Sequence, residues 1–433
     1  MDGIPKMKIT IKLKKLMKIL GPGFVSGASD DDPSGIATYS QTGAQFGYGQ
    51  LWIALFSFPF MAVIQEMCGR IGMVTGKGLS GVIKKHYSKK TLYFSVSLLV
   101  VANTINIGAD LGAMASAGQL ILGVSFIYWL IGIALLIVFL EIIVSYKTYA
   151  KVLKYLAFML LAYIFTAFII KVDWSKVVHS TFIPSFSVSK AYILNIVAIL
   201  GTTISPYMFF WQTNQEVEEG HANNKLGLRA VGTGKGIPDI TDVDVRHMRL
   251  DTNIGMLFSN LVMFFIIVTT ASTLRANGIT HIDTATQAAQ ALRPLAGDFA
   301  FLLFALGILG TGFLAIPVLA GSAAYAVSEV FSWKEGLNKR FKQAHGFYGI
   351  IIAATLIGVI INFLPIKPFT MLYYTAIING IAAPPLMVLV MLIANNKKIM
   401  DKYSNACFSN IFGWIITSIM AIASIALMVS LVF

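Results

Sequence analysis

Three consecutive aspartates, Asp30, Asp31 and Asp32, lie inside an apolar stretch near the start of the chain, and Pro33 follows them directly. A charged side chain at the depth of a lipid bilayer is costly, so aspartates found there usually serve a function. Pro33 removes a backbone donor, and we therefore expect a helix to break here. Carboxylates beside a broken membrane helix are typical of a cation site. The competing interpretation, a surface loop, is disfavoured because apolar sequence continues on both sides.

A second interruption has the same character. Pro206 lies within the apolar stretch 190–219, and the residue before a proline is driven out of helical geometry. If the two breaks meet, every side chain gathered there is an oxygen donor, which suits Mg²⁺, Ca²⁺ and Mn²⁺ better than softer metals. The candidate metal ligands are Asp31, Asp32, Thr202, Thr203 and Ser205.

Further polar residues at apolar positions are candidates for an ion pathway. Asn106 and Asp110 are one helical turn apart and share a face. Gln65 and Glu66 end the second apolar stretch, where they could equally be solvated at the membrane interface. Asn379 precedes a proline pair in a possible kink, which could instead be purely structural. With the groups around the breaks, the candidate pathway residues are Asp30, Ser34, Gly35, Tyr207, Gln65, Glu66, Asn106, Asp110 and Asn379.

The elements that must position these residues are membrane helices. Of 433 residues, 56% are hydrophobic and 12% charged, with a mean hydropathy of +0.74, which excludes an ordinary soluble domain. We count eleven apolar stretches, each near the roughly 20 residues that cross a bilayer. They are 17–46 (interrupted), 49–72, 91–113, 125–145, 151–171, 190–219 (interrupted), 252–276, 299–331, 346–364, 369–394 and 408–432.

The basic residues predict the orientation of these spans. With the N-terminus in the cytoplasm, the segments on the inner side hold 27 of the 33 Lys and Arg residues. We therefore expect a multi-pass plasma-membrane protein with a cytoplasmic N-terminus and an external C-terminus. The net charge of +13 then faces the cytoplasm, and no nucleic-acid partner is expected.

The spacing of the two breaks predicts the topology. The second break lies five spans after the first, and because five is odd the two broken helices run in opposite directions. An inverted repeat of five helices requires this relation, with the ion site where the breaks meet. We expect one transmembrane domain over 1–433, with repeats at about 17–171 and 190–394 and an extra helix at about 408–432.

The polar segment 220–250 is expected to be a cytoplasmic loop. Its residues 232–236 are superficially similar to a phosphate-binding loop, but they lack the full spacing and the flanking strand and helix. Asp242, Asp244 and His247 could bind a metal, although a solvated loop is the favoured interpretation.

Several motifs resemble the Nramp family of divalent-metal transporters, and more narrowly its magnesium-transporting branch. Residues 21–24 precede Asp32 and Pro33 at the spacing of the family, so that Asp32 corresponds to the metal-binding aspartate of its Asp-Pro-Gly-Asn motif. Gln65, Arg70 and residues 71–76 resemble the signature of the second span, and 201–207 resembles the sixth-span motif Gly-Ala-x-x-Met-Pro-His. The resemblance implies a LeuT-type fold of ten helices, plus an eleventh here, that works by alternating access.

The departures from the family pattern concern the metal site. The motif's asparagine falls on Gly35, its alanine on Thr202, its metal-binding methionine on Ser205 and its histidine on Tyr207. Loss of the thioether removes the soft ligand that favours transition metals. The third-span glutamate falls on Ala113, and the ninth span contains no arginine, so most of the proton-transfer network of classical members is missing.

The resemblance therefore implies import of a largely hydrated Mg²⁺, and also of Mn²⁺, without tight proton coupling. The alternatives are a proton-coupled Mn²⁺/Fe²⁺ importer of the classical type and, on the same architecture, a sodium-coupled amino-acid symporter. The aspartates disfavour the symporter because they would repel a substrate carboxylate. We find no set of nucleophile, base and orienting residue, and therefore expect that the protein is not an enzyme. We also expect no cofactor, and a monomer whose partners are the metal ion and the bilayer.

Overall fold

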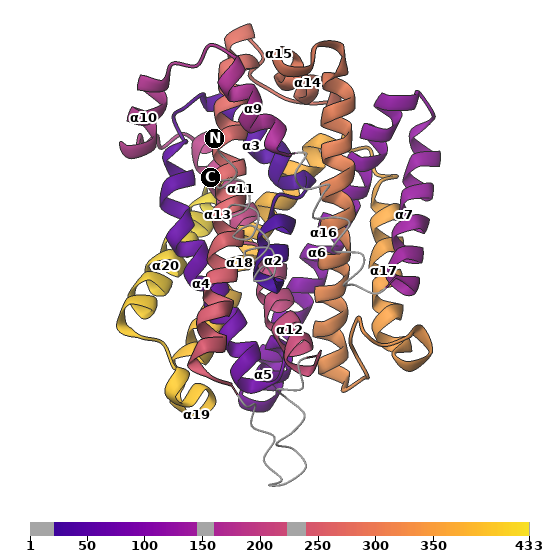
Figure 1. Cartoon of the computed structure of the whole chain (residues 1–433), viewed down its shortest axis with the longest axis vertical. Helices are drawn as coiled ribbons and strands as arrows, with labels where there is room; N and C mark the ends of the chain where they lie inside the picture. Colours follow the sequence, from indigo (N-terminus) through magenta and orange to yellow (C-terminus); the bar gives the residue numbers. More distant parts are fainter. Residues whose placement is uncertain (1–20, 145–159, 223–239, 433) are drawn as a thin grey trace, which may run out of the picture.

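The structure, a computed structural model, describes residues 21–144, 160–222 and 240–432. Every regular element in these ranges is a helix, and the long helices run side by side along the long axis of the molecule (Figure 1). Eight of the described helical segments are long and apolar enough to cross a membrane. The predicted all-helical membrane architecture is confirmed, whereas the count of eleven spans stays a prediction.

The first span is broken at the aspartates. α2 covers Pro22–Asp30 and α3 covers Pro33–Phe46, so Asp31 and Asp32 form the break. Asp32 is extended, with φ −65° and ψ 172°, and Pro33 opens α3 at a position where no amide donor is needed. The first span is therefore broken where the sequence predicts it, directly before Pro33.

The sixth span is broken in the same way. α11 covers Lys190–Thr203 and α12 covers Pro206–Ala222, and Ile204 leaves helical geometry with φ −121° and ψ 60°. In Figure 1, α3 and α11 lie toward the upper end of the molecule, and α2 and α12 lie below them. The two broken helices consequently run in opposite directions, as the spacing of the breaks predicts.

The other elements surround this pair. The long helices are α4 (Trp52–Thr75), α6 (Lys89–Leu122), α7 (Phe126–Ile143), α13 (Asp242–Thr273), α16 (Ala300–Phe331), α17 (His345–Ile361), α18 (Pro368–Asn395) and α20 (Cys407–Val432). The shorter α-helices are α5 (Leu79–His86), α9 (Leu161–Ile169), α10 (Trp174–Phe182), α14 (Ala285–Ala289), α15 (Arg293–Ala296) and α19 (Lys397–Met400). Five 3₁₀ turns are described: η2 (Arg275–Asn277), η3 (Gln290–Leu292), η4 (Gly297–Phe299), η5 (Phe341–Gln343) and η6 (Asp401–Tyr403).

The peripheral helices expose large apolar side chains. Leu135 and Phe139 on α7, and Ile422 and Ile425 on α20, are each more than half exposed. In water such surfaces would be an aggregation hazard, whereas in a bilayer the lipid chains cover them. The outer surface of the bundle is thus suited to lipid, and the polar side chains gather inside it.

α13 differs from the sequence prediction because it begins well before 252. Thr241 and Asp244 form a reciprocal capping box that starts the helix at Asp242, so the segment expected to be a loop up to residue 250 is helical from there on. Asp244 serves this cap, and Asp242 lies 3.7 Å from Lys402. Residues 232–236 lie outside the described residues.

α13 packs closely along α2. A Cβ atom added at Gly27 would lie 2.2 Å from the carbonyl carbon of Gly255, so only glycine allows this approach. At the start of α2, both carboxylate oxygens of Asp251 accept hydrogen bonds from backbone amides, including that of Gly23 at 2.7 Å. A carboxylate at a helix N-terminus also complements the helix dipole. α13 thereby holds α2 up to the break.

Candidate cation site

Asp32 is fixed by three hydrogen bonds from two elements. Its Oδ1 accepts from the amide of Gly35 and the hydroxyl of Ser34, both at 2.7 Å, which caps α3. Its Oδ2 accepts from Nδ2 of Asn106 on α6 at 3.1 Å. The carboxylate is therefore buried and held in one orientation at the break.

Asp30 and Asp31 share one hydroxyl group. Ser259 Oγ on α13 lies 2.9 Å from Asp30 Oδ2 and 3.2 Å from Asp31 Oδ1. The second oxygen of each aspartate is buried and has no hydrogen-bond partner. A hydroxyl has one proton to donate, so it cannot satisfy both carboxylates together. Two acceptor oxygens are left available to a ligand that carries positive charge.

A fourth carboxylate completes the cluster. Asp110 lies one turn after Asn106 on α6, and both of its oxygens are buried without a partner. Within the described residues, no Lys, Arg or His forms an ion pair with any of these four aspartates. An unpaired charge in a low-dielectric interior is strongly unfavourable, so these carboxylates would be stabilised by protonation or by a bound cation.

The hydroxyl groups at the second break differ in the partners that they contact. Thr202 Oγ1 lies 3.5 Å from Ser34 Oγ and so meets the first break. Ser205 Oγ lies 2.9 Å from the carbonyl oxygens of both Gly201 and Thr202, so its single proton can be donated to either, and it caps the end of α11. Its oxygen lone pairs stay free to accept. The Thr203 hydroxyl donates to the Ile199 carbonyl at 2.7 Å, along its own helix.

Tyr207 joins the two breaks from the other side. Its hydroxyl donates to the carbonyl of Ser29 on α2 at 3.1 Å. The ring is fully buried at the start of α12. Together with the Ser34–Thr202 contact, this bond places the two interruptions side by side.

Gly35 and Thr202 fit one another. A Cβ atom at residue 35 would lie 3.1 Å from the Asp30 carbonyl oxygen and 3.3 Å from Thr202 Oγ1, which is tight. A larger side chain at 35 would crowd the threonine. The glycine at 35 and the threonine at 202 are therefore sterically compatible as a pair.

The remaining candidate pathway residues differ in whether their side chains have partners. Gln65 and Asn379 are buried, and neither side-chain amide has a hydrogen-bond partner. Glu66 is committed elsewhere: its Oε1 accepts from Arg70 at 2.9 Å and from Arg249 at 2.8 Å, and its Oε2 accepts from Arg70 at 3.0 Å. The structure thus places Glu66 in an ion-pair network between α4 and α13, apart from the aspartate cluster.

Ser259 is the site residue that sequence reasoning missed. A serine within a 32-residue apolar helix carries little signal by itself. The signal is in the spacing, because Asp251, Gly255 and Ser259 follow one another every fourth residue and share a face. That face lies along α2 from its start to the aspartates.

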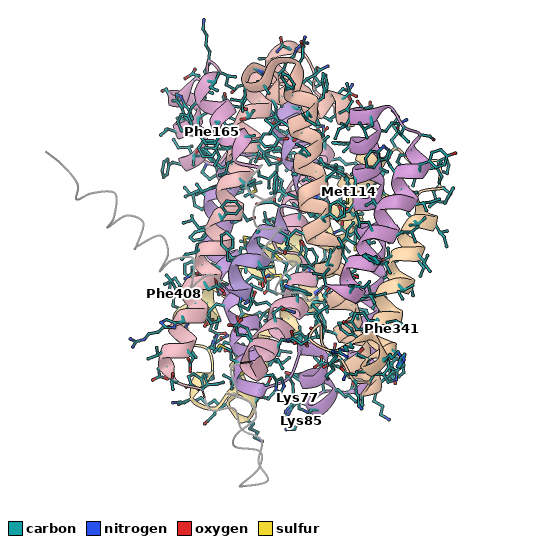
Figure 2. The ribbon with its side chains drawn as sticks, turned by 45° about the vertical axis from the view of Figure 1, so that its right-hand side comes forward. Lys77, Lys85, Met114, Phe165, Phe341 and Phe408 are labelled. Atoms are coloured by element: carbon teal, nitrogen blue, oxygen red, sulfur yellow. The ribbon has the colours of Figure 1, made fainter. Side chains whose placement is uncertain are left out.

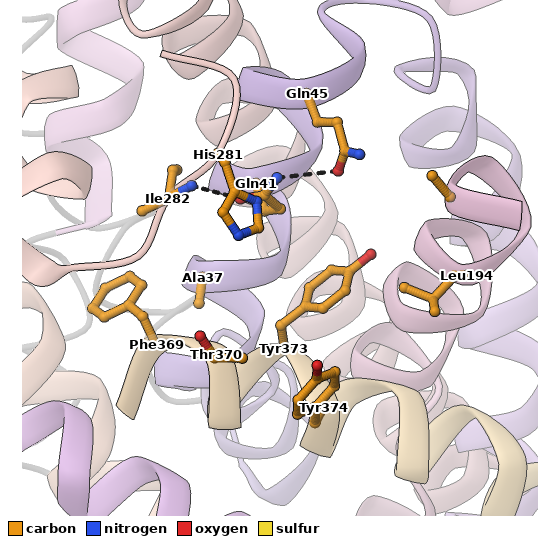
Figure 3. Close-up of a pocket in the computed structure, with 11 residues that line it drawn as sticks. Ala37, Gln41, Gln45, Leu194, His281, Ile282, Phe369, Thr370, Tyr373 and Tyr374 are labelled. Atoms are coloured by element: carbon orange, nitrogen blue, oxygen red, sulfur yellow. Dashed lines mark hydrogen bonds between the residues drawn. The ribbon is translucent and has the colours of Figure 1, made fainter. Parts of the chain in front are cut away.

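A cavity of about 260 Å³ lies between the break and the upper end of the molecule. Its walls come from α3, α11, α18 and the segment before α14, and Ala37, one turn after Ser34, is part of its lining (Figure 3). Gln41 holds one side, since its Oε1 accepts from the Ile282 amide at 2.9 Å and its Nε2 donates to Gln45 and to the Thr280 carbonyl. The cavity therefore lies beside the helix that follows the first break.

The described residues contain no group of three or more His, Cys, Asp or Glu side chains placed to hold a metal ion between them. The aspartates instead surround the break from different sides, with amide and hydroxyl groups between them. Such an arrangement can attract a cation and can contact it through water molecules.

The sequence of this chain is similar to known proteins along almost its whole length. The family model described as natural resistance-associated macrophage protein-like, or Nramp, matches residues 23–430. The divalent metal cation transporter MntH of Caldanaerobacter subterraneus subsp. tengcongensis is 26% identical over 427 residues, which cover 95% of this chain and 93% of that protein. MntH of Klebsiella pneumoniae (strain 342) is 25% identical over 410 residues, covering 94% and 92%.

Solved structures agree on the fold. The manganese transporter of Eremococcus coleocola matches with a TM-score of 0.74 at 15% identity, covering 98% of this chain and 87% of that one. Mhp1, a nucleobase-cation-symport-1 family transporter, matches with a TM-score of 0.56 at 11% identity, covering 95% and 90%. These likenesses confirm the LeuT-type fold expected for two broken helices. Since the family model spans nearly the whole chain, the protein belongs to the Nramp family.

Proposed function

We propose that this protein imports Mg²⁺, and also Mn²⁺, as a largely hydrated ion. Its family and its named relatives make it a divalent metal cation transporter rather than an enzyme. The choice among divalent ions and the mechanism of transport are the parts that we propose.

The observation that carries the proposal is the buried aspartate cluster. Asp30, Asp31, Asp32 and Asp110 lie around the two breaks without a cationic side chain, and several of their oxygens have no partner. A divalent cation would neutralise part of this charge. Because Mg²⁺ dehydrates reluctantly and keeps several waters, it suits carboxylates that surround a space without closing on it.

The second break supports a preference for hard ions. Ser205 and Thr202 offer hydroxyl oxygens, and no thioether or imidazole of the described residues bonds to the aspartates. Hard oxygen ligands do not discriminate in favour of transition metals as a methionine would. Gly35 leaves the Thr202 hydroxyl uncrowded, since a Cβ atom at residue 35 would lie 3.3 Å from Thr202 Oγ1.

We further propose alternating access without tight proton coupling. The cavity bounded by Ala37 and Gln41 would admit the ion to the breaks, and movement of the broken helices would release it at the other end. Ala113 replaces the family glutamate on α6, and α17 carries no arginine. These absences in the described helices remove the groups that would carry protons alongside the metal.

The setting of the transporter is also proposed. We propose that it is a monomer in the plasma membrane. From the distribution of Lys and Arg, we infer that its N-terminus lies in the cytoplasm and its C-terminus outside. We place the inverted repeats at about 17–171 and 190–394. We propose no cofactor, because the metal ion is the substrate.

The second candidate is a proton-coupled Mn²⁺/Fe²⁺ importer. It is favoured by the similarity to a manganese transporter of known structure. It is disfavoured by Ser205 and Tyr207, which stand where classical members keep methionine and histidine. A sodium-coupled amino-acid symporter would need to bring a substrate carboxylate beside four buried aspartates, which like-charge repulsion opposes.

Uptake into proteoliposomes separates these functions. Vesicles would contain either a magnesium-sensitive or a pH-sensitive dye, and Asp32→Asn protein would serve as the control. We expect Mg²⁺ uptake, Mn²⁺ uptake that excess Mg²⁺ inhibits, and no acidification above that of empty vesicles. Mn²⁺ uptake that is unaffected by excess Mg²⁺ and is accompanied by acidification would instead establish the proton-coupled importer.

A further inference from the structure

A basic pocket lies at the end of the molecule that carries α5 and α19, far from the aspartate cluster. It has a volume of about 430 Å³ and is formed by the end of α4, by α5, by Ile240 shortly before α13 and by α19 with the turn that follows. Four lysines line it, Lys77, Lys85, Lys397 and Lys398, and we call it the lysine pocket. Figure 2 shows Lys77 and Lys85 close together at the lower end of the protein.

The lysines outnumber the acidic side chains in the lining of this pocket, and Glu329, outside that lining, interacts electrostatically with Lys77. Asp401 is the only acidic side chain in its lining, and none of the four lysines forms an ion pair with a described carboxylate. Neighbouring lysines are satisfied differently: Lys402 lies 3.7 Å from Asp242, and Lys84 donates to the carbonyls of α16. An excess of lysines on a cytoplasmic face is ordinary, but four that converge on one hollow form a site for an anion.

His86 lies within the positive field of these lysines. It lines the same pocket, and its pKa lies below the usual value because of partial burial and then because of the nearby ammonium groups of Lys85 and Lys77. A positive field disfavours the charged imidazolium. The same field attracts anions.

The uncharged side chains of the lysine pocket could contact the less polar part of a ligand that carries a phosphate group. The ring of Tyr403 and the side chain of Ile399 line the pocket beside the lysines. The volume is within the range of about 300–1,000 Å³ that small-molecule sites occupy. A ligand with a phosphate end and a less polar body therefore matches both halves of the lining.

We propose that the lysine pocket binds the phosphate groups of an anionic ligand. Lysine is a common phosphate ligand that acts as a point charge, and basic pockets between membrane helices on the cytoplasmic side bind lipid headgroups. The phosphate could belong to an anionic lipid or to a soluble nucleotide. The site is separate from the transport function proposed above and does not depend on which metal is carried.

A ligand in this pocket would join segments that are distant in sequence. Tyr403 already links two of them, since its hydroxyl donates to the Ile240 carbonyl at 3.1 Å and its own carbonyl accepts from Arg70. Arg70 in turn binds Glu66. Phosphates held by Lys77 and Lys397 would therefore add a connection next to the ion-pair network that ties α4 to α13.

The test uses the purified full-length protein with two probes. In the first experiment, radiolabelled ATP is added, together with a metal chelator, to protein in phosphatidylcholine nanodiscs, and bound ATP is measured. In the second experiment, phosphatidylglycerol that stays bound to the protein in detergent is measured by native mass spectrometry. The pocket variants are the doubles Lys77→Ala with Lys85→Ala, and Lys397→Ala with Lys398→Ala. The matched control is Lys89→Ala with Lys90→Ala, which removes two lysines from the start of α6 outside the pocket.

We expect one of the probes to bind with an affinity that falls by about tenfold or more in both pocket variants, because each loses two charge-assisted contacts. The control should bind as the wild type does. ATP binding identifies a soluble ligand, and phosphatidylglycerol retention identifies a lipid. Binding of neither probe, or equal losses in the pocket variants and the control, would overturn the proposal. Gel filtration and uptake measurements confirm that each variant is folded.

Discussion

Ser34 on α3 and Thr202 on α11 lie hydroxyl to hydroxyl, 3.5 Å apart, although 168 residues separate them in the chain. The contact brings the first and second breaks together at one place in the bundle. Because Ser34 also donates to Asp32, the contact links the Asp32 carboxylate to the end of α11. An ion bound between the two breaks would contact both broken helices, so their relative movement would move or release it.

Asp32 tests the role of charge at the break. Asp32→Asn keeps an oxygen that can accept from the Gly35 amide, and so keeps the cap of α3, but it removes the negative charge. We expect Mg²⁺ uptake to fall by about tenfold or more, because a charge-assisted contact is worth roughly 1.5–3 kcal/mol. Thermal unfolding in detergent should be close to that of the wild type.

Asp32→Ala is the matched comparison. It should also lose uptake, and in addition it should lose about 1 kcal/mol of stability together with the cap. Near-normal uptake by well-folded Asp32→Asn protein would remove Asp32 from the cation site.

Ser205 tests selectivity. Ser205→Met introduces a soft thioether where the family motif has one, and we expect uptake to shift toward Mn²⁺ and Cd²⁺ relative to Mg²⁺. The substitution also removes the hydroxyl that caps α11 through the Gly201 and Thr202 carbonyls. Ser205→Ala removes the cap without adding sulfur and is therefore the control. If both variants show the wild-type order of ions in competition uptake, Ser205 does not face the ion.

Ser259 tests the bridge between Asp30 and Asp31. Ser259→Ala removes the hydroxyl that, among the described residues, is the one side-chain hydrogen-bond donor to these two carboxylates. Without it the carboxylates lose their fixed orientation, and we expect the apparent affinity for Mg²⁺ in uptake to weaken by several-fold, the effect of a net hydrogen bond of about 1 kcal/mol. Ser259→Thr keeps a hydroxyl and should retain most of the affinity. Equal behaviour of the two variants would argue against the bridge.

Glu66 tests whether the ion-pair network is structural. Glu66→Gln leaves Arg70 buried without its carboxylate, and breaking a buried ion pair in this way costs roughly 3–5 kcal/mol. We expect a clear drop in Tm with an unchanged ratio of Mg²⁺ to Mn²⁺ uptake. Arg249→Gln should cost less, because Arg249 is about half exposed. A changed ion ratio at an unchanged Tm would return Glu66 to the ion pathway.

The sequence was most informative where local chemistry decides the structure. Pro33 and Pro206 each open the second half of a broken helix, as their missing amide and fixed φ require. Most of the described hydrophobic spans could be placed to within a few residues, although α6 continues to Leu122, nine residues beyond the predicted end at 113. The start of α13 could not, because a capping box made by Thr241 and Asp244 extends a helix into polar sequence where hydropathy gives no signal.

The side-chain contacts of the site depend on the rotation of each helix, which hydropathy does not define. Thr202 and Thr203 are neighbours in sequence, yet only Thr202 meets the first break. Gln65 and Glu66 are likewise adjacent, and only Glu66 joins the arginines. Ser259 could have been found only from the repeat of polar and small residues that it shares with Asp251 and Gly255.

The position of the ion tests the account most directly. Crystals soaked in Mn²⁺ would reveal it through anomalous scattering, with and without excess Mg²⁺. We predict one peak between Asp31, Asp32 and Thr202, separated from the carboxylates by water and abolished by Mg²⁺. A peak elsewhere in the bundle, or a peak at this site that persists in excess Mg²⁺, would contradict the assignment of the two breaks as a site for hydrated Mg²⁺.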